Sequence, residues 1–262
     1  MGLPIFHVDA FADRPFRGNP AAVCILAEPR EDPWLQDLAA EMNLSETAFL
    51  LREGEGFRLR WFTPVMEVDL CGHATLASAH ALWEGGYLKP SQKAHFFSRS
   101  GALTAERKKE WIELNFPATP AAPASAPEGL LEALGVEPSY VGKTRFDYLL
   151  EVASEEVLRS LRPDFRALKA LCVRGIIVTS RSAAPPYDFV SRFFAPAAGV
   201  DEDPVTGSAH CSLGPHWRER LQKDEFLAFQ ASQRGGVLQV RVGGDRVFLG
   251  GKAVTVLRGE LV

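Results

Sequence analysis

The sequence predicts an α+β protein made of two related lobes, because strand and helix patterns alternate along its 262 residues and two stretches repeat each other. A motif of arginine, an aromatic residue, phenylalanine, any residue and proline begins at Arg60 and again at Arg192, and a Val-Asp pair follows each copy. Residues 98–103 and 232–237 also resemble each other, at nearly the same separation. Two matches in register indicate an ancient duplication.

A proline-rich segment separates the two predicted lobes. Residues 117–127 contain four prolines, which cannot continue a helix or a central strand. We therefore expect an N-terminal lobe at 1–118, a linker at 117–127 and a C-terminal lobe at 128–251. A final strand at about 252–262 is expected to pack back onto the first lobe.

Local signals predict the other elements in order. Asp32 is the expected N-cap of the first helix, with Pro33 as its first helical residue and Asn43 at its end. Residues 47–51 then form a buried strand, and 111–116 an alternating one. In the second lobe Pro163-Asp164 opens a helix and 175–179 form a strand. The apolar stripe of the first helix consists of Trp34, Leu35, Leu38 and Met42.

An apolar helix is expected after each copy of the repeated motif. The first begins with Gly72-His73, and the second begins with Gly207-Ser208. Pro215 is expected to end or kink the second helix, because proline has no backbone N–H. The start of a helix presents free N–H groups and the positive end of the helix dipole, so each turn is an expected site for an anion. A substrate carrying a carboxylate fits this expectation.

Composition excludes several classes of protein. The chain is 46% hydrophobic with a formal charge of −4, and its one basic run, 107–109, has acidic neighbours, so no nucleic-acid partner is expected. No apolar stretch approaches the roughly 18 residues needed to span a bilayer. The N-terminus lacks the pattern of a secretory signal, and the four scattered cysteines (24, 71, 172 and 211) fit reduced thiols in a cytoplasm.

Five blocks, in this order along the chain, resemble the phenazine-biosynthesis isomerase (PhzF-like) family. They are Phe-His-Val-Asp-Ala-Phe at 6–11, Gly-Asn-Pro-Ala-Ala-Val at 18–23, Asn-Leu-Ser-Glu-Thr-Ala-Phe at 43–49, Cys-Gly-His-Ala-Thr-Leu at 71–76 and Asp-Pro-Val-Thr-Gly-Ser-Ala at 203–209. The resemblance implies a diaminopimelate-epimerase-like fold, in which each lobe is a mixed sheet curled around a central helix and the site lies between the lobes. It also implies a homodimer and an isomerase that acts on a dihydro-hydroxyanthranilate-like substrate without cofactor or metal.

By motif, the resemblance places the acid and base of the reaction on Glu46 and supporting polar residues on His73, Asp203 and Ser208. One carboxylate can remove a proton at one carbon and return it at another if its pKa lies nearer neutrality than about 4.3, which partial burial achieves. Each of these residues could instead have a purely structural role. Glu46 could form a local cap or ion pair, His73 could be packed at the helix start, Asp203 could form an Asx-type turn and Ser208 could cap its helix. Backbone N–H groups of Gly72 and Gly207 are expected to help bind the substrate.

Two other hypotheses stay open from the sequence. The first is an amino-acid or hydroxy-acid racemase that uses Cys71, although a separation of 132 residues pairs Cys71 with Asp203 and not with a second thiol. The second is a small-acid-binding protein without turnover. The remaining histidines, His80, His210 and His216, are interpreted as structural, and zinc spacings, nucleotide-binding glycine motifs and a serine-nucleophile motif are absent.

Overall fold

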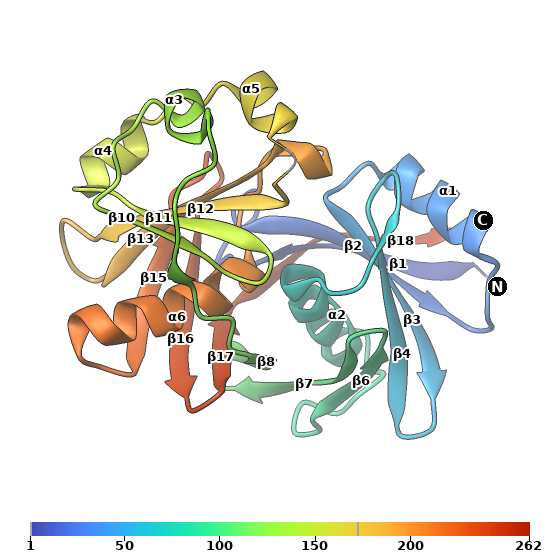
Figure 1. Ribbon diagram of the computed structural model, residues 1–262. Coiled ribbons are helices and arrows are strands. Elements are labelled where there is room, and N and C mark those ends of the chain that lie inside the picture. Colours follow the sequence, from blue (N-terminus) through green and yellow to red (C-terminus); the bar gives the residue numbers. More distant parts are fainter. Residues whose placement is uncertain (1, 172) are drawn as a thin grey trace. The chain divides into compact units, whose positions relative to one another are not determined.

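The computed structural model describes residues 2–171 and 173–262, which divide into two compact units. The first unit contains the chain up to Phe116 together with Leu249–Val262, and the second contains Pro117–Phe248. Each unit combines a mixed sheet with a few helices, which confirms the predicted α+β class (Figure 1). No helix among the described residues is long and apolar enough to cross a membrane.

The first unit is a strand-rich layer with one helix on each side. Its strands are β1 (Leu3–Ala10), β2 (Asn19–Leu26), β3 (Glu46–Glu53), β4 (Gly56–Phe62), β5 (Glu67–Val68), β6 (Ala94–Ser98), β7 (Gly101–Lys108), β8 (Trp111–Pro117) and β18 (Ala253–Leu261). Helix α1 (Asp32–Met42) packs on β3 and β4 through Leu35, Ala39 and Phe49. Helix α2 (Gly72–Glu84) packs on β1, β2, β3 and β18, and ten of its thirteen residues are buried (Figure 1). Helix α2 is therefore the central helix of this unit.

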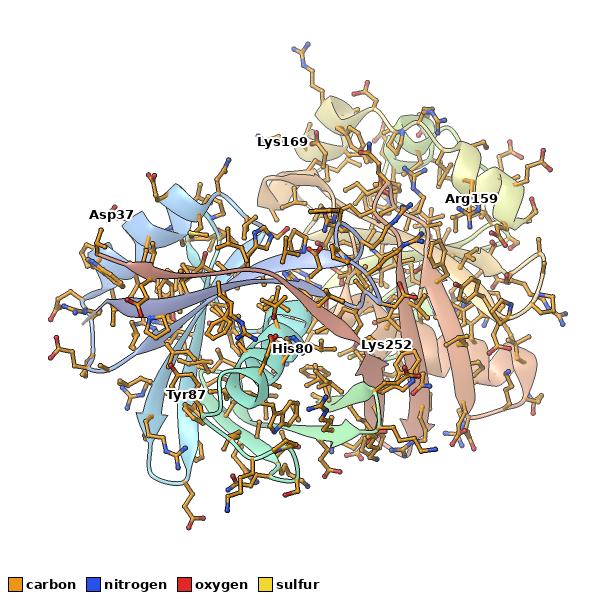
Figure 2. The ribbon with its side chains drawn as sticks, turned by 180° about the vertical axis from the view of Figure 1, so that it is seen from behind. Asp37, His80, Tyr87, Arg159, Lys169 and Lys252 are labelled. Carbon is orange, nitrogen blue, oxygen red and sulfur yellow. The ribbon has the colours of Figure 1, made fainter. Side chains whose placement is uncertain are left out.

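The second unit repeats the arrangement with more helices. Its strands are β9 (Ala122–Pro123), β10 (Tyr140–Lys143), β11 (Asp147–Glu151), β12 (Gly175–Arg181), β13 (Phe189–Ala195), β14 (Val200–Glu202), β15 (Glu225–Gln230), β16 (Gly236–Gly243) and the first half of β17 (Arg246–Gly251), whose last three residues belong to the first unit. Its helices are α3 (Leu130–Leu134), α4 (Glu155–Ser160), α5 (Phe165–Ala170), the 3₁₀ helix η1 (Pro196–Ala198) and α6 (Gly207–Leu221). Helices α3, α4 and α5 bury an apolar cluster around Leu158, Leu168 and Val178, while Arg159 and Lys169 point to solvent (Figure 2).

Strand pairing shows that the two units share one topology. In the first unit, β1–β2 are antiparallel, β2–β3 parallel, β3–β4 antiparallel and β4–β6 parallel. In the second, β10–β11, β11–β12, β12–β13 and β13–β15 follow the same order of directions. In the first unit, helix α2 follows the short strand β5 and connects the parallel strands β4 and β6. In the second unit, helix α6 follows the short strand β14 and connects β13 and β15 in the same way. The predicted duplication is thus present in the backbone.

The duplicated arginine motif forms the same contact in both units. Arg60 makes two hydrogen bonds of 2.7 Å to Glu67, and Arg192 makes bonds of 2.7 and 2.9 Å to Glu202. Each guanidinium also lies over the phenylalanine two residues further along its strand, at 5.0 Å and 4.8 Å. These bidentate pairs join β4 to β5 and β13 to β14.

The boundary between the two units differs in detail from the one expected. Residues 117–127, expected as a linker, belong to the second unit, where Ala122–Pro123 pairs with β10 as a short strand. Proline is tolerated at such an edge because its missing N–H faces away from the ladder. Strand β18 pairs antiparallel with β1 and belongs to the first unit.

Helix ends followed the local signals with one shift. Asn43 ends α1 in a left-handed conformation, and Asp164 caps α5 by accepting a 3.0 Å hydrogen bond from Ala167 N–H, as predicted. The N-cap of α1 is Glu31 and not Asp32, and no side chain caps it. Asp32 instead pairs with Arg60 at 2.8 Å, so its carboxylate is used in a tertiary contact.

Pro215 does not end its helix, which was one of the two outcomes expected, because α6 continues through it to Leu221. Proline leaves the carbonyl four residues earlier without its helical donor. That carbonyl belongs to Cys211, and it accepts a 3.1 Å hydrogen bond from Thr119 N–H. The Thr119 and Ser212 hydroxyls lie 2.9 Å apart beside it. The proline-rich segment therefore supplies the donor that Pro215 lacks.

His210 is a fully buried neutral side chain of α6, and it makes the second unit sensitive to acid. Its Nδ1–H donates to the Thr206 carbonyl at 2.8 Å and its ring stacks on Phe189. Burial lowers the pKa of His210 to about 4, below the roughly 6.5 of an unfolded chain. A lowered folded pKa stabilises the protein above pH ~6.5, and this stabilisation is lost as the pH falls towards 4.

We predict that this loss reaches about 2–3 kcal/mol between pH 6.5 and 4.5, since one proton changes the free energy of unfolding by about 1.4 kcal/mol per pH unit. Urea unfolding of the wild type and of His210→Gln at both pH values measures it. The variant should show a smaller difference between the two pH values. An identical difference in both proteins would contradict the assignment.

Candidate active site

Three elements of the first unit begin at the same place and position the candidate site. Strands β2 and β3 are parallel, with Ala21 opposite Glu46, so their first residues Asn19 and Glu46 lie at one edge. On β3, Phe49 faces α1, and the alternation of side chains therefore directs Glu46 to the α2 side. The first turn of α2 brings His73 to the same point. Neighbouring secondary structure thus assembles a carboxylate, an imidazole and an amide.

The Glu46 carboxylate and the His73 imidazole form the centre of the cluster. His73 Nε2 lies 3.1 Å from Glu46 Oε2, and the two side chains are 5% and 18% exposed. This is the distance of an ion pair, but Oε2 is buried and accepts no well-aligned hydrogen bond among the described residues. The geometry leaves a lone pair of the carboxylate available to a proton.

Asn19 is the residue that sequence reasoning missed. Its buried Nδ2 lies 3.1 Å from His73 Nδ1, so in neutral His73 it donates to Nδ1 and leaves the ring N–H on Nε2, facing Glu46. When His73 is protonated, a half-turn of the amide presents an oxygen to Nδ1–H instead. Asn19 was part of a family block, but nothing in its local sequence indicated a histidine partner 54 residues away.

Cys71 is the fourth member of the cluster and the N-cap of α2. Its Sγ lies 3.5 Å from His73 Nδ1 and 4.0 Å from Nε2. Burial, with the nearby Glu46, raises the pKa of the Cys71 thiol to about 11, so the thiol is neutral near pH 7. The interpretation of Cys71 as a buried side chain agrees with its 6% exposure, but the contact with His73 adds a role in the cluster.

Charge interactions favour protonated His73. Burial alone would lower its pKa, but the adjacent Cys71 and Glu46 outweigh burial and raise the pKa of His73 well above 6.5. Because the Cys71 thiol is neutral near pH 7, the carboxylate of Glu46 is the partner that matters there. A carboxylate beside an imidazolium is a base and an acid held together.

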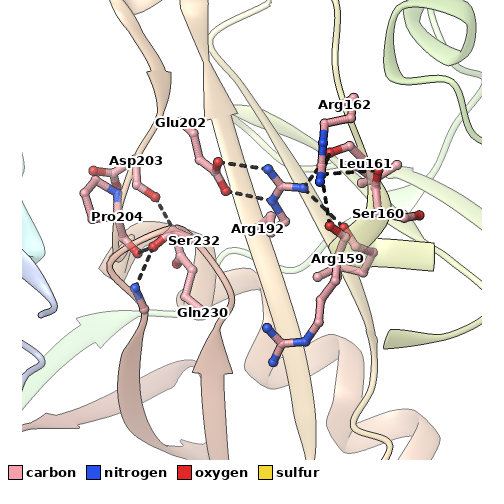
Figure 3. Close-up of polar contacts among 12 residues, drawn as sticks. Arg159, Ser160, Leu161, Arg162, Arg192, Glu202, Asp203, Pro204, Gln230 and Ser232 are labelled. Atoms are coloured by element: carbon pink, nitrogen blue, oxygen red, sulfur yellow. Dashed lines mark hydrogen bonds and ion pairs between the residues drawn. The ribbon is translucent and has the colours of Figure 1, made fainter. Parts of the chain in front are cut away.

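The predicted residues of the second unit gather in the turn before α6. Thr206 Oγ1 donates to the Asp203 carboxylate. Gln230 donates to the Asp203 carbonyl at 2.7 Å (Figure 3). Gln230 also accepts from Thr206 N–H at 2.8 Å, which fixes the turn. Ser208 lies in the first helical turn and does not cap α6, because the N-cap is Thr206. The half-buried Asp203 thus makes hydrogen bonds within the turn that precedes α6.

The two helix starts correspond to each other with a separation of 135 residues, and the expected pairing of Cys71 with Asp203 was wrong. Cys71 and Thr206 are the N-caps, and Gly72 and Gly207 are the first helical residues. The 3₁₀ helix η1 lengthens the turn between β13 and β14, which moves the register by three residues. Thr206 is therefore the counterpart of Cys71, and a second thiol is absent there. Neither helix start has a side-chain cap or an acidic residue in its first turn.

The protein has an α+β fold of two repeated units, and in the first unit a carboxylate and an imidazole meet beside the start of the central helix, an arrangement suited to proton transfer. The model of the phenazine biosynthesis-like protein family matches residues 8–259, and the chain belongs to this family. An uncharacterized isomerase of Halalkalibacterium halodurans is 57% identical over 263 residues, covering 100% of this chain and 99% of the relative. The protein is an isomerase of this family.

Solved structures agree with this assignment. A phenazine biosynthesis protein of the PhzF family from Enterococcus faecalis is 42% identical, with a TM-score of 0.94 and full coverage of both chains. A probable proline racemase from Agrobacterium radiobacter has a TM-score of 0.68 over 99% of this chain and 93% of its own, at 12% identity. The second likeness shows the fold alone, which is the predicted diaminopimelate-epimerase type.

Proposed function

We propose that the protein moves a proton between two carbons of a small carboxylate-bearing substrate of the dihydro-hydroxyanthranilate type, with Glu46 as the single acid and base. Glu46 removes a proton from one carbon, and the electron pair of the broken C–H bond enters the adjacent unsaturated system. The protonated Glu46 then returns the proton to a second carbon, so no cofactor is consumed. The observation that carries the proposal is the buried Oε2 of Glu46, at 3.1 Å from His73 Nε2 without an aligned hydrogen bond.

His73 supports this chemistry in two ways. As an imidazolium it places a positive charge 3.1 Å from Glu46 Oε2, the base of the first step. His73 also lies in the first turn of α2, where the free N–H groups carry partial positive charge. The imidazolium and these N–H groups together stabilise negative charge that develops on the substrate. We propose that Asp203, Gly207 and Ser208 bind polar groups of the substrate, on the strength of the family motif.

Transfer by one carboxylate has an isotopic signature that a two-base racemase lacks. Turnover of dihydro-hydroxyanthranilate in heavy water should give product that keeps part of the original hydrogen, since the same oxygen carries it between carbons. A racemase that used Cys71 would instead exchange the α-hydrogen of an amino or hydroxy acid, and lose this exchange in Cys71→Ala. Ligand retention with no chemistry would favour a binding protein. The Cys71 thiol, with a pKa of about 11 and Thr206 as its counterpart, argues against the racemase.

Asn19 acts on His73 and provides a test of the arrangement. Asn19→Leu removes the hydrogen-bond partner of Nδ1, and we expect kcat to fall roughly 10–100-fold, by analogy with the range seen when a group that orients a metal-binding histidine is lost. Asn19→Asp places a second carboxylate at Nδ1, so the limb of the pH profile that reports His73 should move to higher pH. A lower kcat with an unmoved pH profile in Asn19→Asp would mean that Asn19 only fills space.

A further inference from the structure

The side chains of Glu46, Cys71 and His73 form a set of three different metal ligands. One ligand atom from each lies within 4.8 Å of the other two. From His73 Nε2, the Glu46 Oε2 atom is 3.1 Å away and the Cys71 Sγ atom 4.0 Å away. Zinc bonds of about 2.0–2.3 Å in a tetrahedron hold such atoms roughly 3.3–3.6 Å apart. All three atoms lie within 4.8 Å of one another, so shifts of up to about one ångström would bring them around one ion.

Sequence spacing did not reveal this set because its members come from two segments. Cys71 and His73 are separated by one residue at the start of α2, and Glu46 is the first residue of β3. The side-chain amide of Asn19 is well placed to support His73 when its Nε2 binds a metal ion. Such a histidine carries its proton on Nδ1, and Asn19, 3.1 Å away, can accept from it through its amide oxygen.

We propose that Glu46, Cys71 and His73 bind a divalent cation of the zinc class, and that the bound ion inhibits the isomerase. Binding releases the thiol proton of Cys71 and the second proton of His73 to solvent, and the ion gains one sulfur, one nitrogen and one oxygen ligand. The charges of the thiolate and the carboxylate cancel that of the ion, which favours a buried site. A thiolate ligand selects zinc or cobalt over magnesium or calcium.

Inhibition follows from the use of Glu46, and this part rests on the proposed function. The oxygen that would take the substrate proton is the one that binds the ion. His73 likewise loses the positive charge that it places beside the carboxylate. A fourth position on the ion stays open to water or to a substrate carboxylate.

Cobalt titration of the whole chain tests binding without any need for turnover. One equivalent of Co²⁺ should produce a thiolate-to-cobalt charge-transfer band, which Zn²⁺ abolishes and excess Mg²⁺ does not. Cys71→Ala should remove the band and weaken Co²⁺ binding at least about tenfold. Cys24→Ala is the matched control, because Cys24 is also a free, fully buried cysteine of the first unit, and it should keep the band.

Turnover measured in parallel separates the two proposals. Zn²⁺ should inhibit the wild type, chelation should restore it, and Cys71→Ala should need at least about tenfold more Zn²⁺ for the same inhibition. A missing band, or a band that survives in Cys71→Ala, would overturn the metal site. Metal binding at this site with undiminished turnover would overturn both inhibition and the assigned role of Glu46, while the metal site itself would stand.

Discussion

Glu46→Gln is expected to lower kcat by roughly 10³-fold or more, because one carboxylate performs both proton transfers and general acid–base catalysis contributes about 10²–10⁴-fold. The amide has nearly the same shape but cannot take up a proton at neutral pH. KM should change little, since the amide still fills the space beside His73. Steady-state kinetics with the isomerisable substrate measure both constants.

Glu53→Gln is the matched control for this change. Glu53 ends the strand that Glu46 begins, and its exposed carboxylate pairs with Arg58 at 2.9 Å. An exposed pair of this kind contributes at most about 1 kcal/mol, so turnover should stay within a factor of two or so of the wild type. If Glu46→Gln kept a kcat similar to that of Glu53→Gln, proton transfer by Glu46 would be ruled out.

Local chemistry made several elements of the fold predictable from the sequence. Asn43 and Asp164 marked helix ends because the left-handed conformation and the side-chain cap depend on single residues. The repeated Arg motif predicted the duplication because it reappears with its aromatic neighbour. It did not predict the partners Glu67 and Glu202, which stand 135 residues apart while the arginines stand 132 apart.

Contacts between distant segments account for the errors. Pro215 was expected to end or kink α6 because it lacks a backbone N–H. The helix continues, and the donor for the Cys211 carbonyl is Thr119, which lies 92 residues earlier in the chain than Cys211. The candidate site shows the same limit. Glu46 and His73 were predicted from motifs, but the contact of Asn19 with His73 depends on the parallel pairing of β2 and β3, which no local pattern specifies.

Glu202→Gln is expected to lower the free energy of unfolding by about 3 kcal/mol, because removing one partner of a largely buried pair leaves the other charge uncompensated. The Arg192 side chain is 10% exposed, and its other acceptors are the neutral carbonyls of Leu158, at 3.3 Å, and Leu161, at 3.0 Å (Figure 3), so the variant leaves no negative charge beside the guanidinium. The melting temperature should fall by roughly 6–12 °C. Differential scanning calorimetry measures this change.

Two comparisons decide whether charge is the cause. The double variant Arg192→Met with Glu202→Leu removes both charges and should recover most of the loss, since apolar replacements of a buried pair are often neutral. Glu67→Gln, the counterpart in the first unit, should cost less than half as much, because Arg60 keeps Asp32 at 2.8 Å and is more exposed. Equal losses for Glu67→Gln and Glu202→Gln would contradict this account. Glu202 directly precedes Asp203, in the turn that we propose binds the substrate. If the ion pair holds this turn, Glu202→Gln should also lower turnover at temperatures below its melting temperature.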